Sequence, residues 1–512
     1  MCGICGIYRK GHGGISRNII IAMRDIMTQR GPDDAGVYIG DHIGLGHRRL
    51  SIIDLSSAGN QPMSNENNTI WMVFNGEIYN FKSLKEELKK SGHVFKSRTD
   101  CEVIIHGYEE WGEALFVKLN GMFAFALWDS TREQLILARD RIGKKPLFYS
   151  DINGSVVFAS DIKSILAGMD GNQVVDEHAI DCYLSHICIP HAHTIYKNVK
   201  KVPPAHYIVF NSNASKMKRY WFLSFTNKIK MNEKEYIDHI LELLTVSVKD
   251  RLYSDVPIGA FLSGGVDSSL IVALMSQVSG KKINTFSVGF DYQSYNELPY
   301  AKKVADRYNT NHHEFILSVD YLDIIPQLVW NYGEPFADSS AIPSYYISRI
   351  ARTCVKTVLV GDGGDEAFAG YDRTQYPYRT ALYKKMVPRF VARSFSPIID
   401  YFSSNTYLFN RIKYYEEYTN DTTKKRYQNY LGCIKERDLL YSENFKKMIA
   451  DHHPSHVYGD YYDLSDGTDD VDKVLFVDYN TILPDDYQVK MDVASMANSL
   501  EVRAPFLDHR LV

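Results

Sequence analysis

Residues 262–269 read Leu262-Ser263-Gly264-Gly265-Val266-Asp267-Ser268-Ser269 and join the apolar run 256–262 to a helical pattern. Glycines at such a junction let the backbone close around phosphate oxygens, while the helix N-terminus adds the positive end of its dipole. The stretch lacks the lysine of a Walker A loop, so transfer of a γ-phosphate is not the natural inference. A turn that only caps a helix would explain a bare Gly-Gly pair, but the complete octet after an apolar strand favours a nucleotide phosphate loop.

The segments after this loop alternate between apolar strands and helices. Residues 283–290 and 356–360 read as the next buried strands, and this alternation predicts a doubly wound parallel sheet. The second of these strands leads into the acidic turn 360–366, Val-Gly-Asp-Gly-Gly-Asp-Glu, which should open at the same carboxyl edge of the sheet as the glycine loop. Carboxylates at that edge can hold Mg²⁺ against pyrophosphate or move a proton.

The N-terminal part of the chain has a different pattern. Helical spacing at 19–27, 80–90 and 100–111 surrounds β-rich runs at 70–74 and 122–127, which predicts an α+β layered domain. The pattern decays between residues 202 and 232. We therefore expect two domains, residues 1–210 and residues 211–512.

Bulk composition restricts the class of protein. The 512 residues are 45% hydrophobic and 23% charged with a formal net charge of −4, so nothing favours nucleic acid or an anionic membrane as a partner. The number of cysteines is odd, seven, which is untypical of a disulfide framework and favours a reducing compartment. The N-terminus does not resemble a signal peptide, and no apolar run is long enough to span a bilayer. We expect a cytoplasmic protein.

Cys2 becomes the first residue once the initiator methionine is removed, so one residue then carries both a thiol and a free α-amine. An α-amine titrates at about 7.7 to 8.0, which lets it take the thiol proton and later protonate a leaving ammonia without a histidine base. A redox or metal pair of Cys2 with Cys5, or simply a small residue after methionine, would also explain the position. Four further segments favour the nucleophile.

These segments supply what amide hydrolysis at a terminal cysteine needs. Asn75 and Gly76 follow a buried strand, where an amide side chain and a glycine N–H can point together at an oxyanion. Arg49 offers a fork for a carboxylate, whereas Glu77 and Asp100 offer partners for an ammonium group. Free glutamine carries both groups. Each residue alone reads as a surface charge, but together they match an amino-acid pocket.

The order of five motifs resembles the class II glutamine amidotransferase domain of asparagine synthetases. The motifs are Cys-Gly-Ile-Cys-Gly (2–6), Arg-Gly-Pro-Asp-Asp (30–34), Gly-His-Arg-Arg-Leu-Ser-Ile-Ile-Asp (46–54), Gln-Pro-Met (61–63) and Phe-Asn-Gly-Glu-Ile-Tyr-Asn (74–80). The resemblance implies an Ntn-hydrolase αββα sandwich with Cys2 as nucleophile and with Asn75 and Gly76 as the oxyanion hole. The residues it implies for glutamine binding are Arg49, Leu50, Ser51, Ile52, Ile53, Glu77 and Asp100.

Residues 262–269 are similar to the PP-loop of ATP-pyrophosphatases, which cleave ATP between the α- and β-phosphates and leave an acyl-adenylate. The resemblance implies Mg²⁺ near Asp267 and Asp365, with Asp362 as a catalytic carboxylate. The residues it implies around the nucleotide are Leu262, Ser263, Gly264, Gly265, Asp267, Ser268, Val288, Val360 and Gly361.

The resemblance covers nearly the whole chain and implies amidation of a carboxylate by ammonia from glutamine, with ATP and Mg²⁺ as cofactors. Aspartate is the default acceptor, and a homodimer is one assembly that fits. One rival is the same machinery acting on a sugar carboxylate in surface-polysaccharide biosynthesis. A second rival is a binding or regulatory protein in which only the glutaminase half works.

Two departures from the family pattern bear on these rivals. Asp362 stands where strict asparagine synthetases usually have glutamate, and residues 339–344, Ser-Ser-Ala-Ile-Pro-Ser, lack an arginine that many of them have. Both features also resemble relatives that amidate sugar carboxylates. The family usually continues well beyond Asp508, including a phosphate-binding lysine, so we expect a C-terminally truncated synthetase domain.

Overall fold

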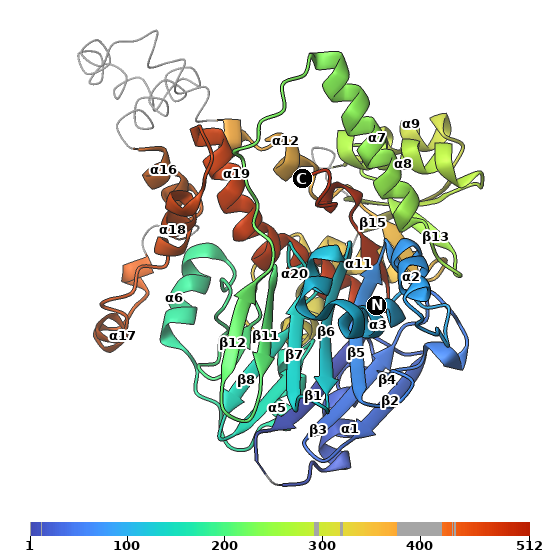
Figure 1. The fold of residues 1–512 in the computed structure, drawn as a ribbon. Helices are drawn as coiled ribbons and strands as arrows, with labels where there is room; N and C mark the ends of the chain where they lie inside the picture. Colours follow the sequence, from blue (N-terminus) through green and yellow to red (C-terminus); the bar gives the residue numbers. More distant parts are fainter. Residues whose placement is uncertain are drawn as a thin grey trace.

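The computed structural model describes residues 2–11, 13–290, 296–317, 321–375, 422–432, 434 and 437–512. The chain forms an N-terminal part built on two antiparallel sheets and a C-terminal part built on one parallel sheet (Figure 1). No helix among the described residues is long and apolar enough to cross a membrane.

Two six-stranded sheets form the N-terminal part. The first has the order β10-β8-β9-β1-β3-β2 and the second the order β12-β11-β7-β6-β5-β4. Strands of the first are β1 (Gly3–Arg9), β2 (Asp34–Ile39), β3 (Ile43–Arg49), β8 (Phe148–Ile152), β9 (Ser155–Ala159) and β10 (Lys200–Lys201). Strands of the second are β4 (Met63–Ser64), β5 (Ile70–Ile78), β6 (Gly121–Asp129), β7 (Gln134–Arg139), β11 (His206–Phe210) and β12 (Ser215–Arg219).

The sheets pack face to face, and helices cover their outer faces. Ile4 and Leu45 of the first sheet share one apolar cluster with Val73 and Leu135 of the second. The helices of this part are α1 (Arg17–Asp25), α2 (Phe81–Lys90), α3 (Glu102–Trp111), α4 (Leu115–Lys118), α5 (Ile162–Gly168) and α6 (Glu177–His186). Helices α1 and α5 pack on the first sheet, and α2 and α3 on the second. This confirms the predicted αββα sandwich.

The C-terminal sheet is wholly parallel, with the order β15-β14-β13-β16-β17. Its strands are β13 (Ile258–Phe261), β14 (Asn284–Phe290), β15 (Asn311–Leu317), β16 (Thr357–Leu359) and β17 (Glu501–Arg503). Because β14 lies on one side of β13 and β16 on the other, the strand order reverses between β13 and β16. In such sheets a ligand crevice opens at the carboxyl ends of the strands beside the reversal.

Helices cover both faces of this sheet, which confirms the doubly wound prediction. Helices α7 (Glu233–Arg251), α8 (Val266–Ser279) and α9 (Leu298–Arg307) pack on one face. Helices α11 (Ala341–Ala351), α19 (Asp470–Asn480) and α20 (Gln488–Met496) pack on the other. The remaining described α-helices are α10 (Ile325–Tyr332), α12 (Gly364–Phe368), α16 (Thr423–Tyr430), α17 (Glu443–Met448) and α18 (His456–Leu464).

The connection between the two parts lies after β12. Strand β12 pairs with β11 in the second N-terminal sheet, and helix α7 begins at Glu233 behind an Asn232 capping box. A division at residue 210 would separate two hydrogen-bonded strands of one hairpin. We propose that the domains divide between Arg219 and Glu233.

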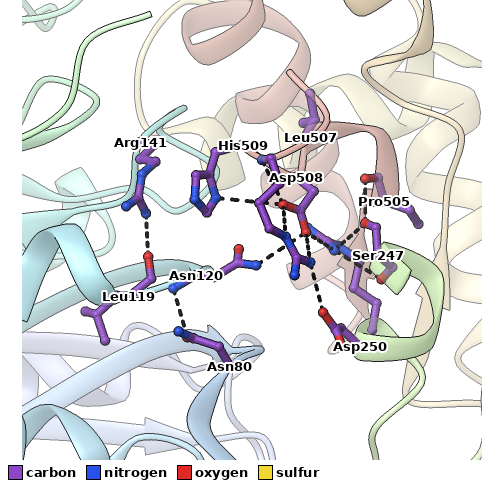
Figure 2. A network of polar contacts seen from close by, with 12 residues as sticks. Asn80, Leu119, Asn120, Arg141, Ser247, Asp250, Pro505, Leu507, Asp508 and His509 are labelled. Carbon is purple, nitrogen blue, oxygen red and sulfur yellow. Dashed lines mark hydrogen bonds and ion pairs between the residues drawn. The ribbon is translucent and has the colours of Figure 1, made fainter. Parts of the chain in front are cut away.

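Buried polar contacts join the two parts. Asp508 Oδ2 accepts hydrogen bonds from Arg251 Nη1 at 3.1 Å and from Asn120 Nδ2 at 3.4 Å, and Asn120 directly precedes β6 (Figure 2). Asp492 of α20 pairs with Arg30 at 2.8 Å and with Lys145 at 3.2 Å. Such pairs are costly to break, so they fix the N-terminal and C-terminal parts relative to one another.

Candidate active sites

Cys2 lies at the start of β1, buried beside the end of β5. Its backbone N–H donates to Asn75 Oδ1 at 3.0 Å, which orients the amide side chain of Asn75. Asn75 Nδ2 is buried and has no hydrogen-bond partner in the part of the chain that the structure describes. Burial raises the pKa of the Cys2 thiol, while the Leu50 backbone and the charge of Arg49 act in the opposite direction. An unmet amide donor on a side chain that contacts the cysteine backbone is suited to stabilise an oxyanion.

Gly76 continues β5 opposite β6, with a φ of +155°. A Cβ atom at this position would overlap the carbonyl oxygen of Met122, so the close pairing of the two strands requires glycine. The next residue, Glu77, is buried, and so is Asp100, which accepts the Ile78 N–H at 2.6 Å. Burial raises the pKa of Asp100 to about 6. The predicted oxyanion and ammonium-binding residues therefore lie together.

Arg49 is buried at the end of β3, and the loop after it occupies its guanidinium. Nη1 donates to Ser56 O at 3.0 Å and to Asn60 Oδ1 at 2.7 Å, while Nη2 donates to Asp54 O at 2.5 Å and to Ile53 O at 3.4 Å. These bonds hold the side chain rigidly. Of the guanidinium nitrogens, only Nε makes none of these loop contacts, so Nε is the atom that could bind a carboxylate.

Arg503 is a residue of this site that reasoning from the glutamine pocket missed. It belongs to β17 of the C-terminal sheet, yet its Nη2 lies 2.7 Å from Glu77 Oε1 and its Nε 2.6 Å from Glu501 Oε1. Burial raises the pKa of Glu77, and Arg503 opposes that rise. Arg503 and Glu77 are 426 positions apart in the sequence, so nothing local to either residue indicates the other as its partner.

The glycine loop connects β13 to α8 as predicted. Gly264 has a φ of +86°, and a Cβ there would lie 2.6 Å from Tyr300 Cβ, so only glycine fits. Ser263 Oγ lies 3.0 Å from Ser268 Oγ and accepts the Gly265 N–H at 3.2 Å. These bonds shape a turn at the N-terminus of α8, where backbone N–H groups can meet an anion.

The acidic turn follows β16 and lies against this loop. A Cβ on Gly364 would overlap the Asp267 carboxylate, and one on Gly361 would lie 2.9 Å from Ser268 N. Burial, together with the charges of Asp365 and Asp362, raises the pKa of Asp267 to about 6. Carboxylates gathered in this way are donors that suit Mg²⁺.

A cleft of about 730 Å³ opens where the two turns meet. Of the predicted nucleotide and metal residues, those that line it are Ser263, Gly265, Asp267, Ser268, Val360, Gly361, Asp362 and Asp365. Leu262 lies in the apolar core behind the loop, and Val288 is half-buried on the neighbouring strand β14. The cleft is therefore mainly lined by the two turns.

Lys490 of α20 is a cleft residue that the sequence did not indicate. Its Nζ lies 3.1 Å from Asp338 Oδ2 and donates to Ser340 Oγ at 3.0 Å. Burial lowers the pKa of Lys490, but the charges of Asp338 and Asp362 together outweigh burial, so the pKa is raised. A cation thus stands beside residues 339–344, where the sequence lacks an arginine.

A small cavity lies between the two sites. It holds about 20 Å³ of free space and is lined by Met122, which pairs with Glu77 between β6 and β5, and by Asp362 of the cleft. Lys144, Lys145 and Asp492 also line it. About 10 to 15 Å³ is enough for one water molecule, so the cavity can hold a molecule the size of ammonia.

Comparison with known proteins agrees with this arrangement. A family model described as a glutamine amidotransferase domain matches residues 1–221, and one described as asparagine synthase matches residues 239–512. Glutamine-hydrolyzing asparagine synthetase 1 of Bacillus subtilis (strain 168) is 33% identical over 99% of this chain and 79% of its own length. Asparagine synthetase 3 of the same organism is 31% identical over 100% of this chain and 80% of its own length.

A fungal relative has a different name. Amidase chyE of Penicillium rubens is 34% identical over 68% of this chain and 54% of its own length. Both halves of the chain, in the predicted order, match the two domains of glutamine-hydrolysing asparagine synthetases. The chain therefore belongs to the asparagine synthetase family and is an enzyme of the glutamine-dependent amidotransferase and ligase type.

Proposed function

We propose that this enzyme amidates aspartate, using ATP to activate the carboxylate and ammonia released from glutamine to attack it. The observation that carries the proposal is the cavity between Met122 and Asp362, because it lies between a cysteine site suited to amide hydrolysis and a cleft suited to ATP. A glutaminase without a coupled synthetase would have no need of this arrangement.

In the glutaminase half, Cys2 Sγ attacks the amide carbon of glutamine and the α-amine of Cys2 takes the thiol proton. The resulting oxyanion is stabilised by Asn75 Nδ2 and the Gly76 N–H. Collapse of this intermediate transfers the proton to the leaving ammonia and forms a thioester, which water then hydrolyses to glutamate. The unmet donor of Asn75 supports this assignment.

Glutamine itself would be held by its charged ends. Glu77 and Asp100 receive the ammonium group, and the backbone of Leu50, Ser51, Ile52 and Ile53 lies along the substrate. Arg49 attracts the carboxylate through its charge and Nε, because its Nη groups already bind the loop at 53–60.

In the synthetase half, the loop at Ser263, Gly264, Gly265 and Ser268 would cradle the pyrophosphate part of ATP. Val360 and Gly361, which line the cleft, would lie beside the adenosine, whereas Leu262 would support the loop from the core behind it. Mg²⁺ would be held by Asp267 and Asp365 and would neutralise phosphate charge. Attack of the acceptor carboxylate on the α-phosphate releases pyrophosphate and leaves an acyl-adenylate.

Ammonia would then reach the acyl-adenylate without leaving the protein, through the cavity between the sites. Asp362 is buried in the cleft, and burial raises its pKa. Its carboxylate is suited to take the proton that ammonia loses as the amide forms and AMP departs.

Lys490 supports aspartate as the acceptor. Its ammonium group can meet the α-carboxylate in place of the absent arginine, because it lies 3.0 Å from Ser340. The hydroxyl groups of Ser340, Tyr371 and Tyr487 in the same cleft favour a second candidate, a sugar carboxylate.

A screen of acceptors tests the choice through pyrophosphate release in the presence of ATP, Mg²⁺ and glutamine. Saturable release with aspartate, together with asparagine formation, would support the proposal. Release of pyrophosphate with a nucleotide-linked uronic acid and none with aspartate would establish a sugar carboxylate as the acceptor. Release that does not depend on any acceptor would reject both.

A further inference from the structure

A cluster of histidines and carboxylates lies outside both active sites, on the outer side of the glutaminase domain. His106 and Glu109 lie one turn apart on α3, and His93 lies on the loop between α2 and α3. Within the described residues, this is the group of three whose ligand atoms converge within 4.8 Å of one another. The His106 side chain is 2% exposed, so the cluster reaches into the domain.

The distances between the ligand atoms suit a tetrahedral ion. Glu109 Oε2 lies 3.1 Å from His106 Nδ1 and 3.8 Å from His93 Nδ1. Glu66 Oε1 lies 3.9 Å from His106 Nδ1 and can supply a fourth ligand. Zinc bound at about 2.0 to 2.1 Å separates neighbouring ligand atoms by about 3.3 Å, so small side-chain adjustments complete the site.

The outer contacts are those expected around metal-bound histidines. The second nitrogen of His93, Nε2, lies 3.3 Å from Glu110 Oε2, and that of His106 lies 3.6 Å from Glu102 Oε1. Glu102 is buried and held by the backbone N–H groups of Lys96 and Ser97, each at 2.8 Å. A carboxylate on the far nitrogen orients the ring and leaves Nδ1 free for the metal.

We propose that His93, His106 and Glu109, completed by Glu66, form a structural binding site for a divalent transition metal of the zinc class. The ion would tie the loop after α2 to α3. That loop leads to Asp100 of the proposed glutamine pocket.

Zinc titration of the full-length, chelator-stripped chain against a competing colorimetric chelator tests the site. The wild type should bind one tight equivalent that His93→Ala loses. His93 is only partly buried, so this variant should retain its circular dichroism spectrum. A variant in which His453 and His456, an exposed pair with ring centroids 4.7 Å apart, are both replaced by alanine is the matched control and should keep the equivalent.

Two further measurements separate a metal site from a surface ion pair. Glu102→Gln should weaken zinc binding by about 10- to 100-fold, as loss of an outer carboxylate does in known metal sites. Added Co²⁺ should give the wild type a visible absorption spectrum typical of four-coordinate Co²⁺. The Glu109→Gln variant should not show this spectrum. No tight zinc in the wild type, or the same number and affinity of zinc ions in His93→Ala, would overturn the proposal. Neither result depends on glutaminase or synthetase activity.

Discussion

Arg503 Nη2 lies 2.7 Å from Glu77 Oε1, so a side chain of the synthetase sheet reaches the proposed ammonium pocket of the glutaminase domain. The backbone carbonyl of the same arginine accepts the N–H of Val360 at 3.0 Å, and Val360 begins the acidic turn of the proposed ATP cleft. One residue therefore touches the surroundings of both sites. Arg503 therefore connects the pocket, through the ion pair of its side chain with Glu77, to the cleft, through the hydrogen bond of its backbone with Val360.

Arg503→Met should destabilise the protein strongly. It leaves Glu77 buried without the guanidinium that pairs with it, and breaking a buried pair costs about 3–5 kcal/mol. Urea unfolding measures the change. Lys89→Met is the matched control, because Lys89 and Glu86 form an exposed pair whose loss should leave the free energy of unfolding nearly unchanged. Equal losses of unfolding free energy in the two variants would show that the buried pair stabilises the protein no more than the exposed pair does.

Cys2→Ala should abolish glutamine hydrolysis, by about 10³-fold or more, since the thiol forms the covalent intermediate. Amide formation from added ammonium salt should continue, because the ATP cleft is untouched. Glutamate release and ammonia-dependent pyrophosphate release are the two measurements. A variant that still hydrolyses glutamine normally would remove Cys2 from the mechanism.

The Mg²⁺ requirement should depend on pH through Asp267. Its folded pKa of about 6 lies above the ordinary value of 3.8, so the carboxylate takes up a proton as pH falls through 6 and Mg²⁺ must then displace it. The Mg²⁺ concentration for half-maximal ATP/pyrophosphate exchange should therefore rise between pH about 7.5 and pH about 5, by up to about tenfold per unit below the pKa. Asp267→Ala should lose exchange but keep glutaminase activity. A pH-independent Mg²⁺ requirement would contradict the assignment.

Gly364→Ala should damage the ATP cleft alone. The added methyl group would overlap the Asp267 carboxylate and push it from its place between the two turns. Exchange of pyrophosphate into ATP should fall by about 10²-fold or more, as when one preorganised group is removed. Gly14→Ala is the control, since an added Cβ there meets nothing within 4 Å. Undiminished exchange in Gly364→Ala would show that the two turns do not act together.

The features predictable from the sequence are those coded within a few residues. An apolar strand followed by a glycine turn and a helical pattern lies within one short segment, so the loop at 262–269 and its parallel sheet could be predicted. The contact of Lys490 with Ser340 joins residues 150 positions apart, and that of Arg503 with Glu77 joins residues 426 positions apart. Such pairings depend on how the domains pack, which no local spacing encodes.

Leu262 and Val288 were predicted to lie around the nucleotide but are not among the residues that line the cleft, and the cause is similar. The sequence indicates that both are apolar and close to the strand ends, but apolar residues there can face either the nucleotide or the core. Leu262 packs into the core cluster beneath α8. Which face a residue takes is set by the helices that cover the sheet.

The central claim is that ammonia passes from Cys2 to an activated carboxylate inside one chain. Its most direct test supplies glutamine labelled with ¹⁵N in the amide, together with aspartate, ATP, Mg²⁺ and an excess of unlabelled ammonium. We predict asparagine that carries mainly ¹⁵N, formed in step with pyrophosphate and AMP. Asparagine that carries the isotope ratio of the mixed ammonia pool, or pyrophosphate release without any amide product, would contradict the account.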